Sequence, residues 1–167
     1  NTSYMDVVKN SYYVDKTLLI RDLIDDQVPV ILFTRPRRFG KTLALDMLKT
    51  FFEKTKEDTS VYFKDKQIWA CGEKYQKMQG AFPVIFKDAK FSDWASTYAA
   101  IKNVIRDEFM RHDELFTSDS LNPVEQDYLS RMQLDELSEV EYTRALLNLG
   151  RMLEKHHQSK VVILIDE

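Results

Sequence analysis

The chain contains little cysteine, glycine or proline, and it has no long apolar run. Its 167 residues include one cysteine, four glycines and four prolines. The single cysteine, Cys71, excludes an internal disulfide and is typical of a protein from a reducing compartment. No apolar run approaches the roughly 18 residues that a membrane-spanning helix needs, and no basic and apolar signal segment opens the chain. These absences favour a cytoplasmic protein that does not enter a membrane.

Neither sign of charge is in large excess. The 24 basic and 27 acidic side chains leave a formal net charge of -3, so the segment as a whole has no general attraction for nucleic acid. Direct nucleic-acid binding by this segment is therefore not supported. The densest basic cluster is local and consists of Arg35, Arg37 and Arg38. With 44% hydrophobic residues, the chain has enough apolar side chains for the core of one globular domain.

Apolar patterns in the first part of the chain predict a helix, a strand and a second helix. The segment YYVDKTLLIRDLIDD predicts a short helix with Asp15 as its N-cap. The run VPVILFT is continuously apolar, as in a parallel strand that is covered on both faces. From Lys41 onward, apolar residues recur at helical spacing. This order of strand, loop and helix places the basic cluster in the loop.

The remainder of the chain continues the alternation of strands and helices. AFPVIFKDAKF predicts a second strand, and SDWASTYAAIKNVIRDEFM predicts a helix. Capping boxes mark two further helix starts, one at Asn122–Glu125 and one at Ser138–Glu141. The second box opens the longest amphipathic stretch of the chain, which continues to Leu153. The last strand is predicted at Val161–Ile165. Strands that alternate with helices indicate an α/β fold with a parallel sheet.

The loop after the first strand reads RPRRFGKT and ends in Gly40, Lys41 and Thr42. In a Walker A loop, backbone N–H groups at a helix N-terminus surround the phosphates, the lysine reaches the β and γ phosphates, and the hydroxyl binds magnesium. Arg35 stands where that pattern has its first glycine, so a plain basic turn is the alternative interpretation. The predicted nucleotide-binding residues are Arg35, Pro36, Arg37, Arg38, Phe39, Gly40, Lys41 and Thr42.

The chemistry of arginine suggests a phosphate-binding role for Arg37 or Arg38. A guanidinium keeps its charge and forms paired hydrogen bonds with phosphate oxygens, so Arg37 or Arg38 could supplement the backbone donors of the loop. Salt bridges with neighbouring carboxylates, or a solvated turn, are the alternatives.

The final strand, KVVILIDE, ends in two acidic residues. Nucleotide hydrolases contain an apolar strand, called Walker B, that ends in an aspartate of the magnesium shell, and Asp166 stands at such an end. A buried parallel strand whose terminal acid faces solvent is the alternative. Because both motifs occur in order and in strand context, we expect an ATP site with Mg2+, and with Thr42 and Asp166 as metal ligands.

These residues carry a resemblance to a known family. The segments YYVDKT, VILFTRPRRFGKTLALDML, FPVIF and VVILIDE resemble the AAA-ATPase-like family of P-loop NTPases, in which a C-terminal nuclease-like domain often follows. The resemblance spans nearly the whole chain and makes arginine the normal residue at position 35. It implies a three-layer P-loop NTPase-type parallel sheet with flanking helices, incomplete in this chain. Residues 1–167 would be the N-terminal part of that domain and would end at the Walker B strand.

The resemblance also implies the additional-strand class of ATPases. In that class the glutamate after the Walker B aspartate polarises the attacking water, which makes Glu167 the expected catalytic residue. A further strand separates the Walker A and Walker B strands in the sheet. We therefore expect that Val161–Ile165 does not pair directly with Val30–Phe33.

The function expected from these motifs is ATP hydrolysis by the complete protein. The alternative is a nucleotide-dependent switch or scaffold with little turnover that regulates an attached nuclease-like effector. A nucleotide kinase would use the same loop, but the sequence shows no arginine-rich lid. The sequence is also compatible with an oligomer.

Other polar residues receive structural interpretations. His112, His156 and His157 lack a second ligand at metal-binding spacing, and we expect them at solvated helix ends. The stretch HDELFTSDSLN is expected to be a solvated loop. In the ATPases that the chain resembles, the segment before the first strand can lie near the adenine. For Tyr13 and Asp15, a helix cap with packing aromatics is nevertheless the preferred interpretation.

Overall fold

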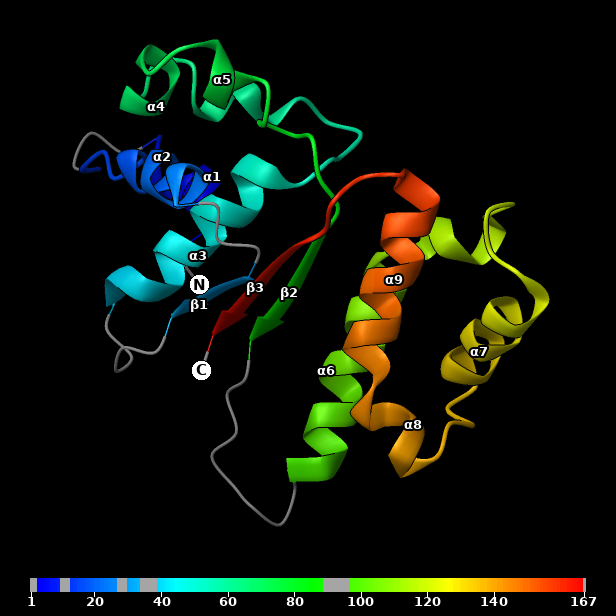
Figure 1. The fold of residues 1–167 in the computed structure, drawn as a ribbon. Helices are drawn as coiled ribbons and strands as arrows, with labels where there is room; N and C mark the ends of the chain where they lie inside the picture. Colours follow the sequence, from blue (N-terminus) through cyan, green and yellow to red (C-terminus); the bar gives the residue numbers. More distant parts are fainter. Residues whose placement is uncertain (1–2, 10–12, 27–29, 34–38, 89–96, 167) are drawn as a thin grey trace. The chain divides into compact units, whose positions relative to one another are not determined.

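The computed structural model describes residues 3–9, 13–26, 30–33, 39–88 and 97–166 (Figure 1). The chain divides into two compact units. Unit 1 comprises Asn1–Val84 and Val162–Glu167, and unit 2 comprises Ile85–Val161. The structure combines helices with parallel strands, so the expected α/β class is confirmed. Within the described ranges, no helix is long and apolar enough to cross a membrane.

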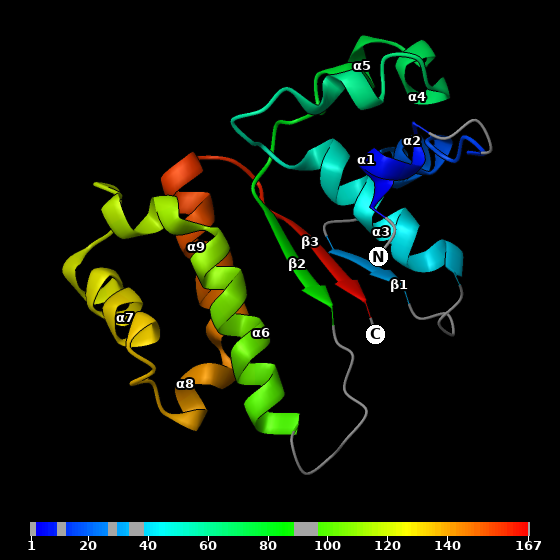
Figure 2. The same ribbon diagram turned by 180° about the vertical axis from the view of Figure 1, so that it is seen from behind.

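Unit 1 contains a small parallel sheet. Strand β1 (Val30–Phe33) pairs with strand β3 (Val162–Asp166), although most of the chain separates them in sequence. The paired residues are Val30 with Ile163, Ile31 with Leu164, Leu32 with Ile165, and Phe33 with Asp166. Figure 2 shows the two arrows running in the same direction, so their carboxyl ends lie at one edge.

The direct pairing of β1 with β3 shows that the expected strand order is wrong. The two strands form a continuous parallel ladder, with no strand between them. Both strands are short apolar runs, and the backbone N–H and C=O groups on their facing edges pair in this register. The assignment to the additional-strand class is therefore overturned, and Glu167 loses the class-based argument for a catalytic role.

The helices of unit 1 make contacts in two groups. Helix α3 spans Phe39–Phe52 and packs against β3 and against α1 (Tyr4–Val7). Helix α2 spans Leu18–Asp25 and contacts α4 (Gln67–Ala70), which is followed by α5 (Glu73–Gln76). A 3-10 helix, η1, covers Thr59–Tyr62. The buried apolar core of this unit includes Tyr4, Ile20, Leu45, Met47, Leu48, Phe51, Phe52, Phe63, Ile68 and Leu164.

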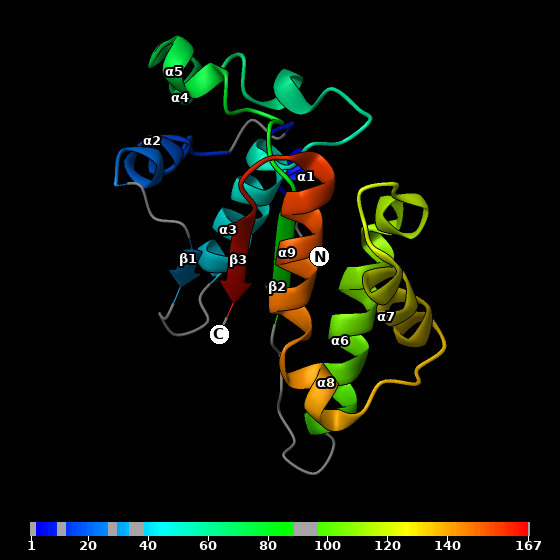
Figure 3. The same ribbon diagram turned by 45° about the vertical axis from the view of Figure 1, so that its right-hand side comes forward.

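Unit 2 is mainly helical. Strand β2 (Val84–Asp88) begins in unit 1 and continues into unit 2, and α6 (Thr97–Arg111) follows. A 3-10 helix, η2 (Asp113–Thr117), then leads to α7 (Pro123–Gln133), α8 (Glu139–Thr143) and α9 (Ala145–His157). Helix α9 contacts α6, α8 and η2, and Figure 3 shows α6 and α9 running side by side.

Two local expectations in unit 2 need correction. The stretch HDELFTSDSLN is not a solvated loop, because it contains η2 and buries Leu115, with 1% of its surface exposed. The helix that starts at the Ser138 capping box is also not continuous. It breaks at Arg144, whose backbone angles are φ -106 and ψ 7, and it resumes as α9.

Candidate functional site

The predicted phosphate loop lies between β1 and α3. Strand β1 ends at Phe33 and α3 begins at Phe39. Arg35, Pro36, Arg37 and Arg38 fall outside the described residues, whereas Phe39, Gly40, Lys41 and Thr42 form the first turn of α3. The first N–H groups of a helix have no partner inside it and carry partial positive charge. A 14-residue helix that starts here is therefore suited to hold an anion at its N-terminus.

The register of the sheet brings the second predicted motif to this loop. Asp166 pairs with Phe33, the last residue of β1. Neighbouring strands lie about 4.8 Å apart, so the backbone of Asp166 is next to the point where the chain enters the loop. Glu167 falls outside the described residues. The ends of β1 and β3 thus lie at the same edge of the sheet, from which the chain leads to the start of α3, although Lys41 and Asp166 are far apart in sequence.

Helix α3 is held by its core side and by its carboxyl end. Leu45, Leu48 and Phe51 are fully buried. At the end of the helix, the carbonyl of Phe51 accepts the N–H of Gly80 at 2.7 Å, and the carbonyl of Phe52 accepts the N–H of Phe82 at 3.0 Å. These bonds satisfy two of the carbonyls that a helix end leaves open. The segment 80–82 therefore anchors α3 at the end opposite to the loop.

A contact with the N-terminal helix holds α3 nearer to the loop. The half-buried carboxylate of Asp46 accepts the backbone N–H of Tyr4 at 2.5 Å. Tyr4 is fully buried, and its hydroxyl donates to the carbonyl of Tyr62 at 2.9 Å. Its ring stacks on Phe63 with 5.1 Å between the ring centroids. Burial raises the pKa of Tyr4, so the phenol stays a neutral donor.

Asp15 and Thr17 hold the start of α4. One oxygen of Asp15 accepts the N–H and the hydroxyl of Thr17, and the other accepts the N–H of Gln67 at 2.8 Å. The Thr17 hydroxyl in turn accepts the N–H of Ile68 at 3.1 Å. Burial alone would raise the pKa of Asp15, but these hydrogen bonds outweigh it and lower the pKa.

This arrangement corrects the expected cap and bears on the adenine question. The N-cap of α2 is Thr17, not Asp15, which instead serves α4. Tyr13 packs edge-on against Tyr4, with ring centroids 5.8 Å apart. Tyr13 is thus engaged in the packing role that the sequence favoured, whereas Asp15 caps a different helix from the one expected.

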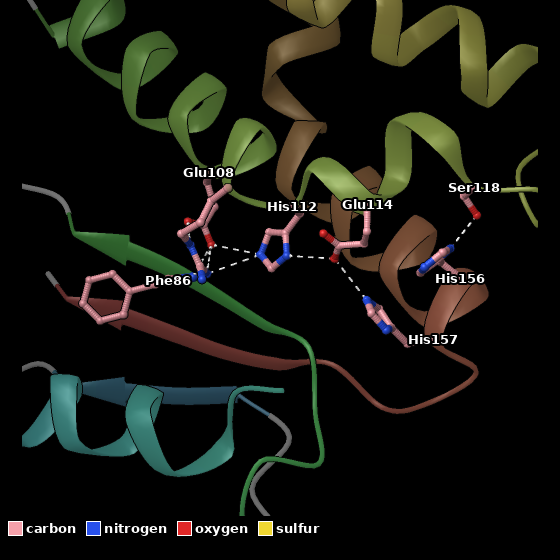
Figure 4. A network of polar contacts seen from close by, with 8 residues as sticks. Phe86, Glu108, His112, Glu114, Ser118, His156 and His157 are labelled. Carbon is pink, nitrogen blue, oxygen red and sulfur yellow. Dashed lines mark hydrogen bonds and ion pairs between the residues drawn. The ribbon is translucent and has the colours of Figure 1, made fainter. Parts of the chain in front are cut away.

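Unit 2 contains a buried polar network that the sequence interpretation missed (Figure 4). Glu108, with 7% of its surface exposed, accepts the backbone N–H of Phe86 at 2.7 Å and pairs with Arg111 at 2.8 Å. His112, which is 5% exposed, lies 3.5 Å from Glu108 and 3.5 Å from Glu114. Glu114 also contacts His157 at 3.1 Å.

The charges in this network stabilise one another. Burial alone would lower the pKa of His112, but the carboxylates of Glu108 and Glu114 outweigh it and raise the pKa to about 9. Burial alone would raise the pKa of Glu114, but His112 and His157 lower it to about 2. At neutral pH the network therefore contains an imidazolium between two carboxylates.

The histidines are accordingly not simply solvated helix ends. His112 is buried. His156 is partly exposed, and its Nδ1 lies 2.5 Å from the hydroxyl of the buried Ser118. The missed signal was helical spacing. Glu108 and His112 complete, with Ile105 and Phe109, the i, i+3, i+4, i+7 pattern of a buried face. Among the residues that the structure describes, no cluster of His, Cys, Asp or Glu is suited to hold a metal ion.

A surface hollow of about 310 Å³ in unit 1 lies apart from the predicted site residues. It is lined by Glu53, Thr55, Lys56, Glu57, Asp58, Thr59, Gln79 and Gly80. Its three carboxylates outnumber its one lysine, so its charge disfavours a triphosphate. We therefore assign no role in nucleotide binding to this hollow.

Comparison with known proteins supports the motif-based interpretation. A family model described as "Predicted AAA-ATPase", of the AAA-ATPase-like family, matches residues 3–167. No curated protein and no solved structure gave a match.

Proposed function

Because the chain belongs to the AAA-ATPase-like family of predicted AAA-ATPases, we propose that it is an ATP- and magnesium-binding P-loop module that hydrolyses ATP in the complete protein. In this proposal, residues 1–167 form the N-terminal part of a P-loop domain. Further strands would complete its three-layer sheet.

The register between Phe33 and Asp166 is the observation that carries the proposal. A nucleotide site needs a loop that opens a helix and a carboxylate beside that loop, because phosphate and its counter-charge meet there. Support comes from the strand ends, which bring the start of the loop and the backbone of Asp166 to one edge of the sheet.

The loop residues have distinct roles in the proposed site. The backbone N–H groups of Arg38–Thr42 surround the phosphates, and Gly40 permits their close approach. Lys41 neutralises the β and γ phosphates as a point charge. Arg37 or Arg38 adds guanidinium donors that supplement the backbone N–H groups of the loop.

The donor chemistry of two residues fits a magnesium ion. The hydroxyl of Thr42 and the carboxylate of Asp166 are hard oxygen donors, and magnesium in proteins is held by one or two carboxylates together with substrate phosphates. Bound magnesium would supply positive charge against the phosphate oxygens. Asp166 would hold this charge at the strand end, beside the start of the loop.

Glu167 is the proposed general base on positional grounds alone. It follows Asp166, and successive residues at a strand end point in different directions, so one carboxylate can serve the metal and the next the water. Because the strand order removes the class argument for Glu167, a second candidate function is retained. It is a nucleotide-dependent switch with little turnover that regulates an attached nuclease-like domain.

Three variants of the full-length protein test these roles. We expect Lys41→Ala to abolish ATP binding in calorimetry, because it removes a point charge from a site for several negative charges. Asp166→Asn should weaken the magnesium-dependent binding of ATP, because it removes the charge of a proposed metal ligand. Glu167→Gln should bind ATP normally but lower the rate of phosphate release roughly 100-fold to 10,000-fold, as expected when a positioned base is lost.

The outcomes separate the two candidate functions. Unchanged ATP affinity in Lys41→Ala would overturn the nucleotide site itself. Equal and measurable hydrolysis by the unaltered protein and Glu167→Gln would remove the catalytic role of Glu167. Tight ATP binding without hydrolysis in both proteins would favour the switch.

A further inference from the structure

Asp46 joins the proposed phosphate-binding helix to the N-terminal helix. Asp46 lies about one helical turn beyond Thr42 in α3. Its Oδ2 atom accepts the backbone N–H of Tyr4, the first residue of α1, at 2.5 Å. That N–H belongs to the group of helix-start donors that have no partner within their own helix. The carboxylate therefore acts as a long-range cap for α1 from the middle of α3.

The partner of Asp46 is held firmly on its other sides. The Tyr4 side chain is fully buried, donates to the carbonyl of Tyr62 and stacks on Phe63. Phe63 in turn packs edge-on against Phe51 of α3, with ring centroids 5.0 Å apart. Tyr4 is thus fixed by packing that does not involve Asp46, and it can serve as a reference point for α3.

The contact between Asp46 and Tyr4 restrains a motion that apolar packing restrains weakly. The buried side chains of α3 are apolar, and hydrophobic contact is non-directional. They are Leu45, Met47, Leu48, Phe51 and Phe52. A hydrogen bond to a carboxylate requires a short distance and a nearly linear geometry. It therefore opposes rotation of α3 about its axis. Such a rotation would move the first turn of the same helix, which contains Lys41 and Thr42.

We propose that Asp46 is a positioning residue for the phosphate-binding loop, because it fixes the rotation of α3 against the anchored backbone of Tyr4. The inference rests on the proposed function, since it assigns Asp46 to the same nucleotide site. Asp46 does not touch the nucleotide in this role. It acts through Tyr4 and the helix.

Two substitutions of Asp46 separate positioning from charge. Asp46→Ala and Asp46→Asn both remove one negative charge, which would by itself favour binding of an anionic ligand. Only Asp46→Asn keeps a side-chain oxygen that can accept the Tyr4 N–H. In calorimetric titration of the full chain with ATP and magnesium, we expect Asp46→Ala to bind about tenfold more weakly. Asp46→Asn should stay within about twofold of the unaltered protein.

Matched controls make the comparison specific. Thr50→Ala removes another polar contact of α3, the bond from the Thr50 hydroxyl to the Asp46 carbonyl at 2.8 Å, but leaves the bond to Tyr4 in place. It should not change the ATP affinity. Circular dichroism and urea unfolding establish that each variant is folded at the titration temperature. If Asp46→Ala does not fold, Asp46→Ser replaces it. Serine keeps a polar group, but its hydroxyl is one bond closer to the backbone than the carboxylate oxygens and is therefore too short to take their place against the Tyr4 N–H.

The results distinguish failure of the inference from failure of the proposed function. If the unaltered protein binds ATP, Lys41→Ala does not, and Asp46→Ala binds as tightly as Asp46→Asn, the positioning role is overturned while the nucleotide site stands. If the unaltered protein does not bind ATP, the proposed function is overturned, and the positioning role falls with it. Weaker binding by Asp46→Ala with rescue by Asp46→Asn supports both.

Discussion

At the scale of single residues, the contrast between Asp15 and His112 shows how burial and partners together decide the charge of a side chain. Burial disfavours the charged form of both residues, yet neighbouring groups reverse its effect in each case. Asp15 is held charged by hydrogen bonds from Thr17 and Gln67, and His112 by two carboxylates. Both charges therefore serve the fold of their own unit.

The buried imidazolium predicts a specific loss of stability in alkaline solution. The pKa of His112 is about 9 in the folded protein and about 6.5 in the unfolded chain. Because the folded pKa is the higher one, the stabilisation is complete below about pH 6.5 and is lost as the pH rises through about 9. The free energy of unfolding should fall by at most about 1.4 kcal/mol per pH unit in this window. Urea unfolding from pH 6 to pH 10 measures it.

The variant His112→Gln provides the control for this pH dependence. Glutamine is polar but does not titrate, so the variant should be less stable than the unaltered protein at pH 7 and should lose the slope between pH 6.5 and pH 9. An unchanged slope in His112→Gln would show that other groups cause the alkaline loss. Glu114 acts in the opposite direction: its contribution is present above about pH 4.5 and is lost as the pH falls towards 2.

At the scale of helices and strands, local sequence signals determine where the helices of unit 2 begin. Helix α7 starts at a capping box in which Asn122 accepts the N–H of Glu125 at 2.8 Å and Glu125 accepts the N–H of Asn122 at 3.0 Å. Helix α8 starts with the same reciprocal pair, made by Ser138 and Glu141. Both boxes were predicted from the sequence, because all the groups involved lie within four residues of one another.

The cap at Ser138 can be tested by replacing serine with alanine at the cap and, as a control, within a helix. Ser138→Ala removes the oxygen that accepts the Glu141 N–H, and we expect a loss of about 1 kcal/mol in the free energy of unfolding. Ser130→Ala makes the same chemical change within α7, at an exposed serine that donates to the carbonyl of Gln126. Because alanine is the better helix former, this control should be neutral or stabilising by up to about 0.5 kcal/mol. Equal effects in urea unfolding would argue against the cap.

Contacts between distant segments were much harder to predict from the sequence. The strand–loop–helix unit of β1 and α3 is local and was predicted, but a strand covered on both faces shows the same continuous apolar run whatever its neighbour is. The pairing of β1 with β3 was therefore predicted wrongly from the strand order of an ATPase class. The bond between Asp46 and Tyr4 could not be predicted at all, since 42 residues separate its partners and neither has a pattern that points to the other.

At the scale of the whole molecule, the division into two units separates the proposed site from the buried polar network. The loop residues, Asp166 and Glu167 all belong to unit 1, whereas Glu108, His112 and Glu114 belong to unit 2. Nucleotide binding and the alkaline loss of stability are therefore expected to report on different parts of the chain. Amide hydrogen exchange can follow the two parts in a single sample.

This separation leads to a prediction about where ATP protects the protein. A ligand that binds only the folded state at 100 times its dissociation constant stabilises it by about 2.7 kcal/mol, which slows exchange through unfolding by about 100-fold. With ATP and magnesium, we expect slower exchange in unit 1, at the amides of Phe39–Thr42, β1 and β3, and no such slowing in Lys41→Ala. Protection that is strongest in α7 and α9 of unit 2, or that persists in Lys41→Ala, would place the nucleotide elsewhere. Protection that begins at the first turn of α3 and extends to Asp46 would instead indicate that the phosphate-binding loop and its helix respond to ATP together.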